Sequence, residues 1–313
     1  MTPSIEATGI NPVKARPFLK WAGGKSQLLE AIRARLPEGI GLGKMTRYAE
    51  PFVGSGAVFF DLSHRFSFSE CLLMDANDDL TRAYQVLQSF PEMLIKALTA
   101  MANEYRALSN EDRRAYFYMV RRAFNEPWQD SGCDAFGPEA VARTARLIFL
   151  NRTCFNGLYR VNSRGRFNVP FGRYDNPTIC DAANLRLVSR ALQGVEIRTG
   201  DFESCADFID AHTFVYFDPP YRPLSKTAHF TSYAAHTFDD ASQLRLARFF
   251  RKLDQRGAKL MLSNSDPKNE NPEDDFFDRV YEGFRIERVK AARAINSNAR
   301  LRGPVNELII TNY

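Results

Sequence analysis

The features that membrane-spanning and disulfide-rich proteins need are scarce in this chain. No apolar run in its 313 residues approaches the ~18 residues that suggest a transmembrane helix, and the N-terminus lacks the short apolar stretch of a signal peptide. The five cysteines lie far apart, with no C-x-x-C pair and no Cys/His grouping that suggests metal ligands. We therefore expect a cytoplasmic protein with reduced structural thiols, no membrane association and no metal.

Extremes of composition are also missing. Hydrophobic residues make up 44% and charged residues 25%, which is typical of globular proteins and excludes disordered and fibrous classes. The 42 Lys+Arg against 37 Asp+Glu give a formal charge of +5, an excess that permits an anionic partner without requiring one. At ~150 residues per domain, the length predicts two domains or one core with a large insertion.

Apolar β-type runs alternate with helical patterns at both ends of the chain, which predicts a mostly parallel sheet covered on both faces. Two further candidate strands near the C-terminus are separated by a Gly/Asn-containing turn and would pair as an antiparallel hairpin that closes the sheet. We therefore predict an α/β fold with about seven strands. The predicted strands are 46–54, 70–75, 195–201, 213–220, 258–266, 285–295 and 305–313.

The segment between the second and third strands has a different pattern of apolar residues. Residues 78–125 have helical apolar spacing, a Gly/Pro-containing loop follows, and another helix is predicted at about 138–151. This segment is too long for one crossover helix. We predict a mainly helical subdomain, residues 82–178, inserted into a core formed by residues 1–81 and 179–313.

A glycine turn follows the first predicted strand in EPFVGSGAVFF, residues 50–60. Gly54 and Gly56 would let the backbone approach a nucleoside-bearing ligand. Phe59 stands where a dinucleotide fingerprint has its third glycine, which disfavours a nicotinamide oxidoreductase. Asp75 ends the next strand, 21 residues after Gly54, where such folds bind ribose hydroxyls. The alternative for Asp75 is an ordinary helix N-cap.

The segment KWAGGKSQLL, residues 20–29, ends in a GKS that suggests a P-loop. Leu19 occupies the place of the first Walker A glycine, so ATP hydrolysis is disfavoured. Lys25 would still suit a ligand carboxylate, and Trp21 could stack on an aromatic ring or a sulfonium.

The most informative element is VYFDPPY, residues 215–221. A buried strand delivers Asp218 to its carboxyl end, and two prolines then fix the backbone while leaving carbonyls free to accept hydrogen bonds. Tyr221 projects beside the acid. An acid, a carbonyl and an aromatic ring held together would receive a planar group that bears an amino substituent.

D-P-P-Y with an upstream F-x-G-x-G is the paired signature of amino-group DNA methyltransferases. The order KWAGGK, EPFVGSG, insertion, DPPY resembles the Dam-type DNA adenine methyltransferases (D12 class, alpha group) from Phe18 to about Asn312. The segment 151–174 resembles the recognition loop and hairpin of members that act on GATC. The resemblance implies a Rossmann-like methyltransferase sheet with an inserted target-recognition subdomain. It also implies the methyl donor S-adenosylmethionine, the product S-adenosylhomocysteine, and double-stranded DNA as the partner.

Carried over by position, the resemblance assigns the candidate site residues. It implies that S-adenosylmethionine contacts Trp21, Lys25, Asp75 and Asp218, lined by Phe52, Gly54 and Gly56, with Asp201 and Phe202 beside its adenine. The catalytic residues would be Asp218, Pro219, Pro220 and Tyr221, which bind an adenine rotated out of the duplex. Phe230 and Tyr233 are further candidates in a loop that would close over this base.

DNA contacts are expected between Arg143 and Arg173, where seven arginines occur and no acidic residue does. A solvated helix face would explain Arg143 and Arg146 equally well, but it explains RVNSRGRF poorly. From this mixture and the resemblance, the DNA-binding candidates are Lys20, Phe155, Asn156, Leu158, Arg160, Asn162, Arg164, Pro170 and Arg173.

Other functions stay open at this point. The substrate could be a longer GAT-containing site or an RNA adenine, and a regulator that only senses S-adenosylmethionine is a different class. The intact Asp218–Tyr221 motif argues against that class. A separate cognate restriction endonuclease is compatible with the sequence, which contains no obvious nuclease domain of its own.

Overall fold

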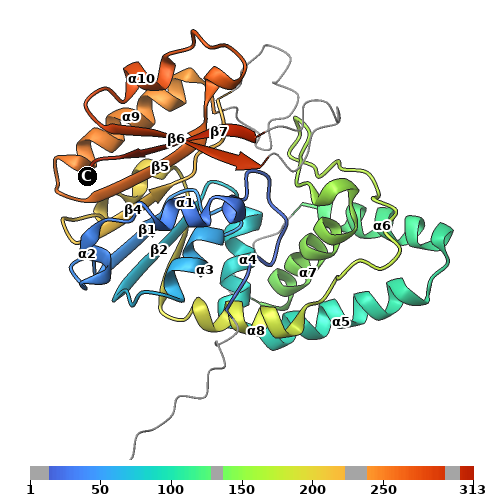
Figure 1. Ribbon diagram of the computed structural model, residues 1–313. Coiled ribbons are helices and arrows are strands. Elements are labelled where there is room, and N and C mark those ends of the chain that lie inside the picture. The colour runs from blue at the N-terminus through green and yellow to red at the C-terminus, as the bar shows by residue number, and fades with distance from the viewer. Residues whose placement is uncertain (1–13, 128–136, 223–237, 293–303) are drawn as a thin grey trace, which may run out of the picture.

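The computed structural model describes residues 14–127, 137–222, 238–292 and 304–313. Its centre is a seven-stranded sheet in the order β3-β2-β1-β4-β5-β7-β6 (Figure 1). The strands are β1 (Arg47–Glu50), β2 (Glu70–Asp75), β3 (Val195–Thr199), β4 (Thr213–Phe217), β5 (Lys259–Ser265), β6 (Arg285–Ala292) and β7 (Pro304–Thr311). Strands β1 to β5 are parallel, and β7 runs antiparallel to both β5 and β6. The predicted α/β fold and closing hairpin are confirmed; the turn at 293–303 lies outside the described residues.

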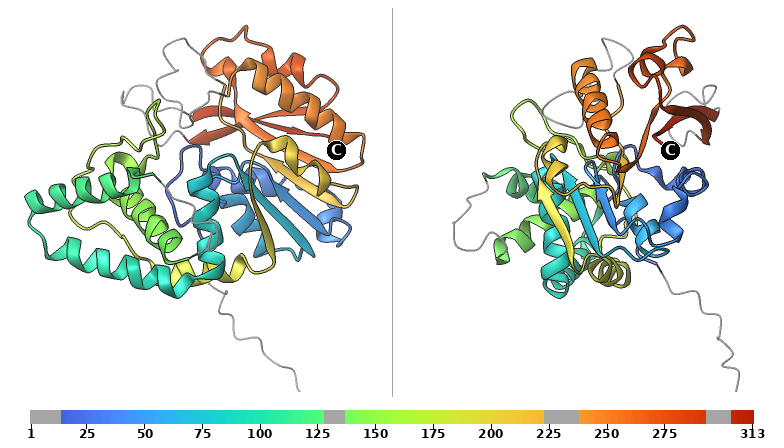
Figure 2. Two further views of the ribbon diagram at one scale, coloured as in Figure 1. Left: turned by 180° about the vertical axis from the view of Figure 1, so that it is seen from behind. Right: turned by 90° about the vertical axis from the view of Figure 1, so that its left-hand side faces the viewer.

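Helices cover both faces of the sheet, as the two views in Figure 2 show. Residues of β4 are buried at every position and alternate between two hydrophobic clusters, with Phe214 and Tyr216 in one and Val215 and Phe217 in the other. This two-sided burial explains why the strands are apolar throughout. The first cluster is covered by α1 (Leu29–Arg33), α2 (Glu38–Gly41), α3 (Ala57–Ser63), α4 (Asp78–Ser89) and α8 (Ala182–Ala191); the second by α9 (Asp240–Asp254), α10 (Phe276–Val280) and the 3₁₀ turn η3 (Phe202–Asp207).

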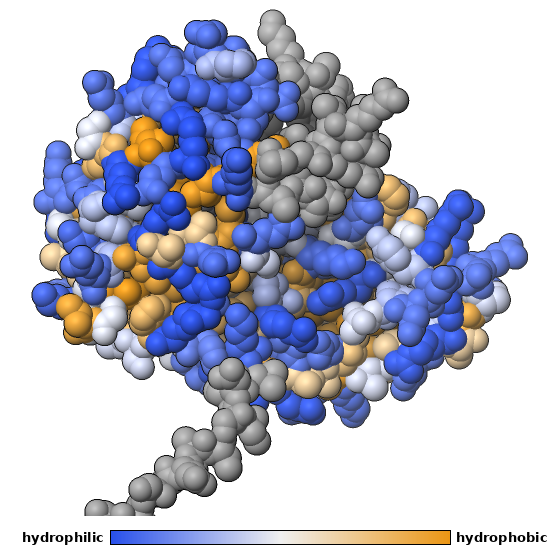
Figure 3. Space-filling model, in the orientation of Figure 1, coloured by the Kyte–Doolittle hydropathy of each residue, from blue (hydrophilic) through white to orange (hydrophobic). Residues whose placement is uncertain are grey.

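The predicted helical stretch 78–125 forms three helices, α4, α5 (Pro91–Ala107) and α6 (Asn110–Asn125). Pro91 starts α5 at its first turn, where a missing N–H is tolerated, and the Ser109 side chain caps α6 by accepting the N–H of Asp112. Helix α7 (Pro138–Thr153) follows, two residues longer than predicted. In Figure 3 the surface over α5 and α6 is mainly hydrophilic. None of the helices in the described parts of the chain is long and apolar enough to cross a bilayer.

The division into a core and an insertion of residues 82–178 stays a prediction. Residue 82 falls inside α4, and this helix contacts β2 and β3 of the sheet. The buried residues of α4 to α8 belong to the same hydrophobic cluster as one face of the sheet. The helical segment therefore packs on the sheet through a continuous core.

The sheet order determines where distant motifs meet. Strands β1 and β4 are neighbours, with Ala49 opposite Val215, although more than 160 residues separate them in the chain. The chain continues from β1 toward β2 on one side and from β4 toward β5 on the other. A crevice at the carboxyl ends of two such strands is the general binding position in open α/β sheets.

Candidate active site

The turn after β1 requires glycine at two positions. Gly54 has φ +47° and Gly56 has φ +69°, which is the left-handed region that L-residues with a Cβ rarely adopt. A Cβ on Gly54 would lie 3.1 Å from the ring of Trp21, and one on Gly56 would lie 2.6 Å from the Tyr84 hydroxyl. That hydroxyl donates to the Gly54 carbonyl at 3.0 Å. The predicted close backbone turn is therefore present, and α4 supports it through Tyr84.

Asp75 is joined to this turn from the end of β2. Its carboxylate accepts the N–H of Gly54 at 3.1 Å and the N–H of Asn77 at 3.0 Å. Burial raises the pKa of Asp75 to about 6, although these backbone donors act in the opposite direction. The N-cap interpretation of Asp75 is wrong, because the cap of α4 is Asn77, whose side chain accepts the N–H of Leu80.

Lys25 lies at the centre of a buried polar network. It begins the 3₁₀ turn η1 (Lys25–Gln27), and only 4% of its side chain is exposed. Its ammonium lies 2.8 Å from Asp218 Oδ1, 2.9 Å from the Tyr221 hydroxyl and 3.1 Å from the Gly23 carbonyl. These contacts occupy all three ammonium donors. Lys25 thus holds Asp218 and Tyr221, and its expected direct contact with a cofactor stays a prediction.

The Asp218 carboxylate follows β4 and keeps 20% of its side chain exposed. The Ser263 hydroxyl on β5 donates to the same Oδ1 at 3.3 Å and is itself 2.7 Å from the Tyr216 hydroxyl. Burial raises the pKa of Asp218, and the Lys25 ammonium partly offsets this. Burial also opposes the charge on Lys25, yet the surrounding acids, Asp218 first, raise the pKa of the ammonium. Each member of the pair thus favours the charged form of the other.

Tyr221 is fixed at its hydroxyl while 40% of the residue stays exposed. The hydroxyl donates to Glu307 on β7, whose two oxygens lie 3.0 and 3.1 Å away, and it accepts from Lys25. The Lys25 ammonium also lies 4.6 Å from the centre of the ring. Sequence reasoning missed Glu307. Its only signal in the sequence is an acidic residue within the strand VNELIIT, and the structure shows that this residue is buried.

The two prolines differ in the use of their carbonyls. The Pro220 carbonyl accepts the side-chain amide of Gln243 from α9 at 3.1 Å. Among the described residues, no donor reaches the Pro219 carbonyl. The expectation of carbonyls free for a ligand is therefore met at Pro219 and not at Pro220.

Aromatic rings lie around the glycine turn. Phe52 packs on the buried Phe202 with ring centres 5.4 Å apart. Trp21 stacks on Tyr159, a residue of the helical segment, at 5.1 Å. Asp201 is exposed and forms an ion pair with Arg245 of α9, whose guanidinium lies 4.5 Å over the Phe202 ring. Residues of the sheet and of the helical segment thus both lie beside the glycine turn.

All DNA-binding candidates except Lys20 lie on residues 153–174, called here the recognition segment. Phe155 is half exposed, at 51%, on the 3₁₀ turn η2 (Phe155–Gly157), and its N–H donates to the Pro170 carbonyl at 2.8 Å. Asn156 adopts φ +56° and donates its N–H to the Tyr174 hydroxyl at 2.9 Å. This turn projects an aromatic side chain toward solvent.

Lys20 lies against the same turn because of Asn151, a buried residue of α7. The Asn151 side chain accepts the N–H of Lys20 and donates to the carbonyls of Lys20 and Gly157, all within 2.9 Å. The Lys20 ammonium lies 5.3 Å over the Tyr174 ring. Sequence reasoning missed Asn151, which joins the KWAGGK motif to the recognition segment.

The rest of the recognition segment is an irregular loop. The expected hairpin is reduced to two isolated bridges, Cys154–Phe171 and Val161–Phe167. Arg160 donates to the Asn168 side chain at 2.7 Å, and the Asn162 side chain accepts the N–H of Arg164 at 3.0 Å. The remaining candidates also lie here: Leu158 is half-buried, Pro170 is exposed and Arg173 has φ +55°.

The basic patch predicted from seven arginines is smaller in the structure. Arg143 pairs with Asp79 at 2.7 Å, Arg146 pairs with Glu139 at 3.3 Å, and the Arg152 guanidinium donates to the Phe18 carbonyl. Acidic side chains therefore neutralise the charges of Arg143 and Arg146. The arginines on the recognition segment itself are Arg160, Arg164, Arg166 and Arg173.

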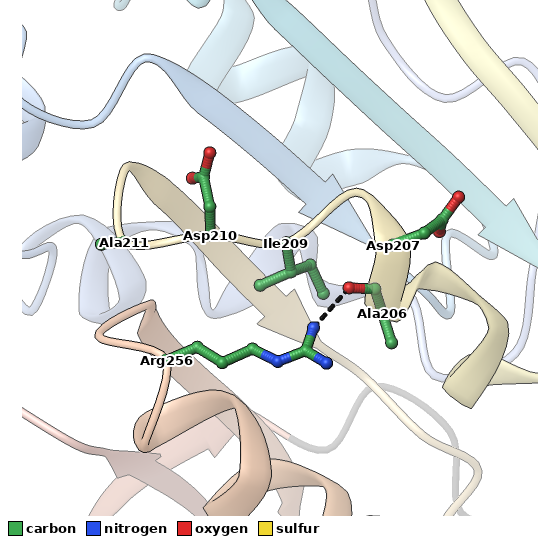
Figure 4. A pocket seen from close by; sticks show the side chains of 6 residues that line it. All are labelled: Ala206, Asp207, Ile209, Asp210, Ala211 and Arg256. Carbon is green, nitrogen blue, oxygen red and sulfur yellow. Dashed lines mark hydrogen bonds between the residues drawn. The ribbon is translucent and has the colours of Figure 1, made fainter.

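A shallow hollow of about 500 Å³ lies elsewhere, lined by residues that include Ala206, Asp210 and Arg256 (Figure 4). Asp210 precedes β4 whereas Asp218 follows it, so the hollow lies at the opposite edge of the sheet.

No cluster of three His, Cys, Asp or Glu residues that could hold a metal occurs within residues 14–127, 137–222, 238–292 and 304–313. Phe230 and Tyr233 lie outside the described residues.

Residues 21–295 match the family model for D12 class N6 adenine-specific DNA methyltransferases. The chain belongs to this family. It is therefore an adenine-specific DNA methyltransferase, and its seven-stranded sheet is the methyltransferase fold that the resemblance implies.

Relatives of this methyltransferase align over nearly its whole length. It is 48% identical over 302 residues to the type II methyltransferase M.MjaIII of Methanocaldococcus jannaschii, covering 96% of this chain and 100% of the relative. It is 38% identical to the type II methyltransferase M1.LlaDCHI of Lactococcus lactis, with 97% of each chain covered. A DNA adenine methylase of Vibrio cholerae is 35% identical, with 95% of each chain covered.

Proposed function

We propose that this methyltransferase transfers a methyl group from S-adenosylmethionine to the N-6 amino group of adenine in duplex GATC, by base flipping and direct transfer. The observation that carries the proposal is the meeting of Asp218 and Tyr221, both held by Lys25, with the glycine turn and Asp75 at one edge of the sheet. An amino-group acceptor and a nucleoside-type crevice are thereby adjacent.

The residues around the glycine turn fit S-adenosylmethionine in their donor set. Asp75 offers a carboxylate for ribose hydroxyls, and the packed rings of Phe52 and Phe202, with Asp201 beside them, suit the adenine. Trp21 lies against Gly54 and suits the sulfonium end. The bound donor would supply a methyl group on a positively charged sulfur and leave as S-adenosylhomocysteine.

The target adenine would be held by the residues that follow β4. Extruding a base from the duplex costs a few kcal/mol, and stacking on the exposed Tyr221 ring would return ~1–3 kcal/mol. The Asp218 carboxylate and the Pro219 carbonyl would accept the two amino protons. These contacts would localise the nitrogen lone pair and orient it, so that catalysis rests largely on positioning.

Sequence recognition is assigned to the insertion, residues 82–178. The half-exposed Phe155 would enter the space left by unstacked bases, with Asn156, Leu158 and Arg160 contacting base edges and Lys20 reaching the first guanine. Asn162 and Arg164 would lie along the duplex, with Pro170 and Arg173 supporting the recognition surface. GATC is proposed because residues 151–174 resemble the recognition loop of members that act on this site.

A separate restriction endonuclease is proposed as a cognate partner. Two relatives bear the name type II methyltransferase, and both align over nearly their full length. This proposal concerns biological role only and leaves the chemistry of methyl transfer unchanged.

Methyl transfer from tritiated S-adenosylmethionine to short duplexes tests the proposal. A GATC duplex should accept label, and duplexes with each base pair permuted in turn should not. Asp218→Ala should abolish transfer without abolishing DNA binding. Methylation of another adenine context, mapped by long-read sequencing of DNA from expressing cells, would refute the proposed site, and turnover by Asp218→Ala would refute the mechanism.

A further inference from the structure

Gln243 is a buried polar residue that the proposed chemistry does not use. It lies in the first turn of α9 and is 0% exposed. Its side-chain amide donates a hydrogen bond to the Pro220 carbonyl, at 3.1 Å. The inner face of α9 is otherwise apolar, with Leu246, Phe249 and Phe250 in the hydrophobic cluster. A glutamine is therefore unexpected there on packing grounds alone.

The carbonyl end of the Gln243 side chain makes glutamine energetically costly at this position. The Gln243 carbonyl oxygen is buried and has no hydrogen-bond partner among the described residues. A buried acceptor without a partner is destabilising, and an apolar side chain of the same volume would avoid that penalty. The residue is thus disfavoured for stability, which points to its amide donor as its contribution.

Backbone geometry explains what that donor controls. The Pro220 carbonyl and the Tyr221 N–H belong to one planar peptide group. The proline ring fixes φ of Pro220, so the orientation of this plane is set by ψ of Pro220 alone. A hydrogen bond that holds the Pro220 carbonyl therefore fixes the direction in which the chain enters Tyr221.

The residue on the other side of Tyr221 is held by the same helix. The Arg222 guanidinium forms two hydrogen bonds to Asp240 of α9, at 2.6 and 3.0 Å, and a third to Asp274 at 2.6 Å. It also lies 4.2 Å over the Phe276 ring. Both neighbours of Tyr221 are thus attached to the α9 side of the sheet, whereas its hydroxyl is held by Lys25 and Glu307.

We propose that Gln243 is a positioning residue for methyl transfer, which acts by fixing the Pro220–Tyr221 peptide plane and through it the Tyr221 ring. This inference rests on the proposed function, in which Asp218 and Tyr221 hold the target adenine. It assigns to α9 a part in the reaction that no sequence motif indicates.

Gln243→Met tests the inference, because methionine keeps the length and volume and removes the amide donor. The matched control is Gln85→Met in α4, whose amide likewise donates to a single backbone carbonyl, that of Ile197 at 3.2 Å. The measurement is the single-turnover methylation rate at saturating DNA and S-adenosylmethionine, together with the affinities for DNA and S-adenosylhomocysteine and the melting temperature.

We expect Gln243→Met to lower the single-turnover rate about 10- to 100-fold, since a misplacement of about 1 Å at the reacting groups can cost about 100-fold. Both affinities should stay at wild-type values, and Gln85→Met should leave the rate unchanged. If Gln243→Met does not fold, Gln243→Leu gives the same test, because leucine also lacks a donor for the Pro220 carbonyl and suits the apolar inner face of α9.

Two outcomes would overturn the inference. One is a wild-type rate in a folded Gln243 variant, and the other is a rate loss accompanied by an equal loss of affinity for S-adenosylhomocysteine, which would indicate a general disturbance of the crevice. Asp218→Ala separates this failure from failure of the proposed function. If Asp218→Ala is inactive while Gln243→Met is fully active, only the role of Gln243 is wrong.

Discussion

Replacing Lys25 with methionine should make activity and stability change in opposite directions as the pH rises. The substitution removes the ammonium that lies 2.8 Å from Asp218 and 2.9 Å from the Tyr221 hydroxyl. Burial already raises the pKa of Asp218, and Lys25 is the group that lowers it. Without Lys25 the pKa of Asp218 should rise further.

The sign of each effect follows from this shift. An acid whose pKa is raised by folding is more costly to ionise in the folded state than in the unfolded state. The free energy of unfolding of Lys25→Met should therefore fall as the pH rises. The fall begins at the pKa of Asp218 in the unfolded chain, near 3.8, and continues through its raised pKa in the folded protein. Activity should change in the opposite direction. The proposed mechanism needs the Asp218 carboxylate ionised to accept the amino protons, so the rate should rise over the same range of pH.

The magnitude follows from the burial of the pair. Removing one partner of a fully buried ion pair costs ~3–5 kcal/mol. Asp218 keeps 20% of its side chain exposed, so the lower end of this range, ~3 kcal/mol, applies where the carboxylate is ionised. Where Asp218 is protonated, the loss should shrink to the lost hydrogen bonds of the ammonium, about 1–2 kcal/mol.

Urea denaturation and single-turnover methylation, each followed across about pH 5 to 9, are the assays; this interval is wide enough to include a strongly raised carboxyl pKa. Lys14→Met is the matched control, because it removes a lysine from Asp61, which keeps Arg33 and Arg65 as partners. The double variant Lys25→Met/Asp218→Asn should regain stability over Lys25→Met and remain inactive. If the double variant is no more stable than the single one, the argument from an unpaired buried carboxylate is refuted.

Four further predictions concern other parts of the molecule. Gly56→Ala should lower the free energy of unfolding by at least ~1–2 kcal/mol, since φ is +69° there, and unchanged denaturation would contradict this. Glu307→Gln should slow methyl transfer at unchanged DNA affinity, because the Tyr221 hydroxyl loses a charged acceptor; a rate equal to wild type would show that the charge is dispensable. Arg160→Ala should cost ~1–3 kcal/mol of discrimination at one base pair, whereas uniform weakening across duplexes would assign it to phosphate. Arg164→Gln should reduce the slope of log affinity against log salt by about 1, which filter binding at several salt concentrations measures, and an unchanged slope would remove it from the DNA backbone.

Strands and motifs could be predicted from sequence because their signals are local. Strand β2 begins and ends at the predicted residues, and β4 lies within 213–220. Strand β1 ends at Glu50, four residues before the prediction, because Pro51 and the glycine turn follow at once. The stretch 78–125 is helical as predicted, and Pro91 and Ser109 divide it into three helices.

The missed residues all act across long sequence separations. Glu307 reaches Tyr221 over 86 positions, and Asn151 reaches Lys20 over 131. No spacing rule links such positions; only the strand order and the packing of α7 bring them together. The same limit explains why the basic patch is smaller than the sequence suggested, because the acid that pairs with Arg143 is Asp79, 64 residues earlier.

The position of β7 has a consequence for how the enzyme matures. This strand is the last of the seven to be synthesised, yet it is inserted between β5 and β6 rather than added at an edge. Until it is made, β5 presents an unpaired edge and the Tyr221 hydroxyl lacks its acidic acceptor. A ribosome-bound chain that already contains Lys25 and Tyr221 is therefore both incomplete in its site and prone to pair with other strands. Closure of the sheet and completion of the hydrogen bonds that hold Tyr221 are then one event.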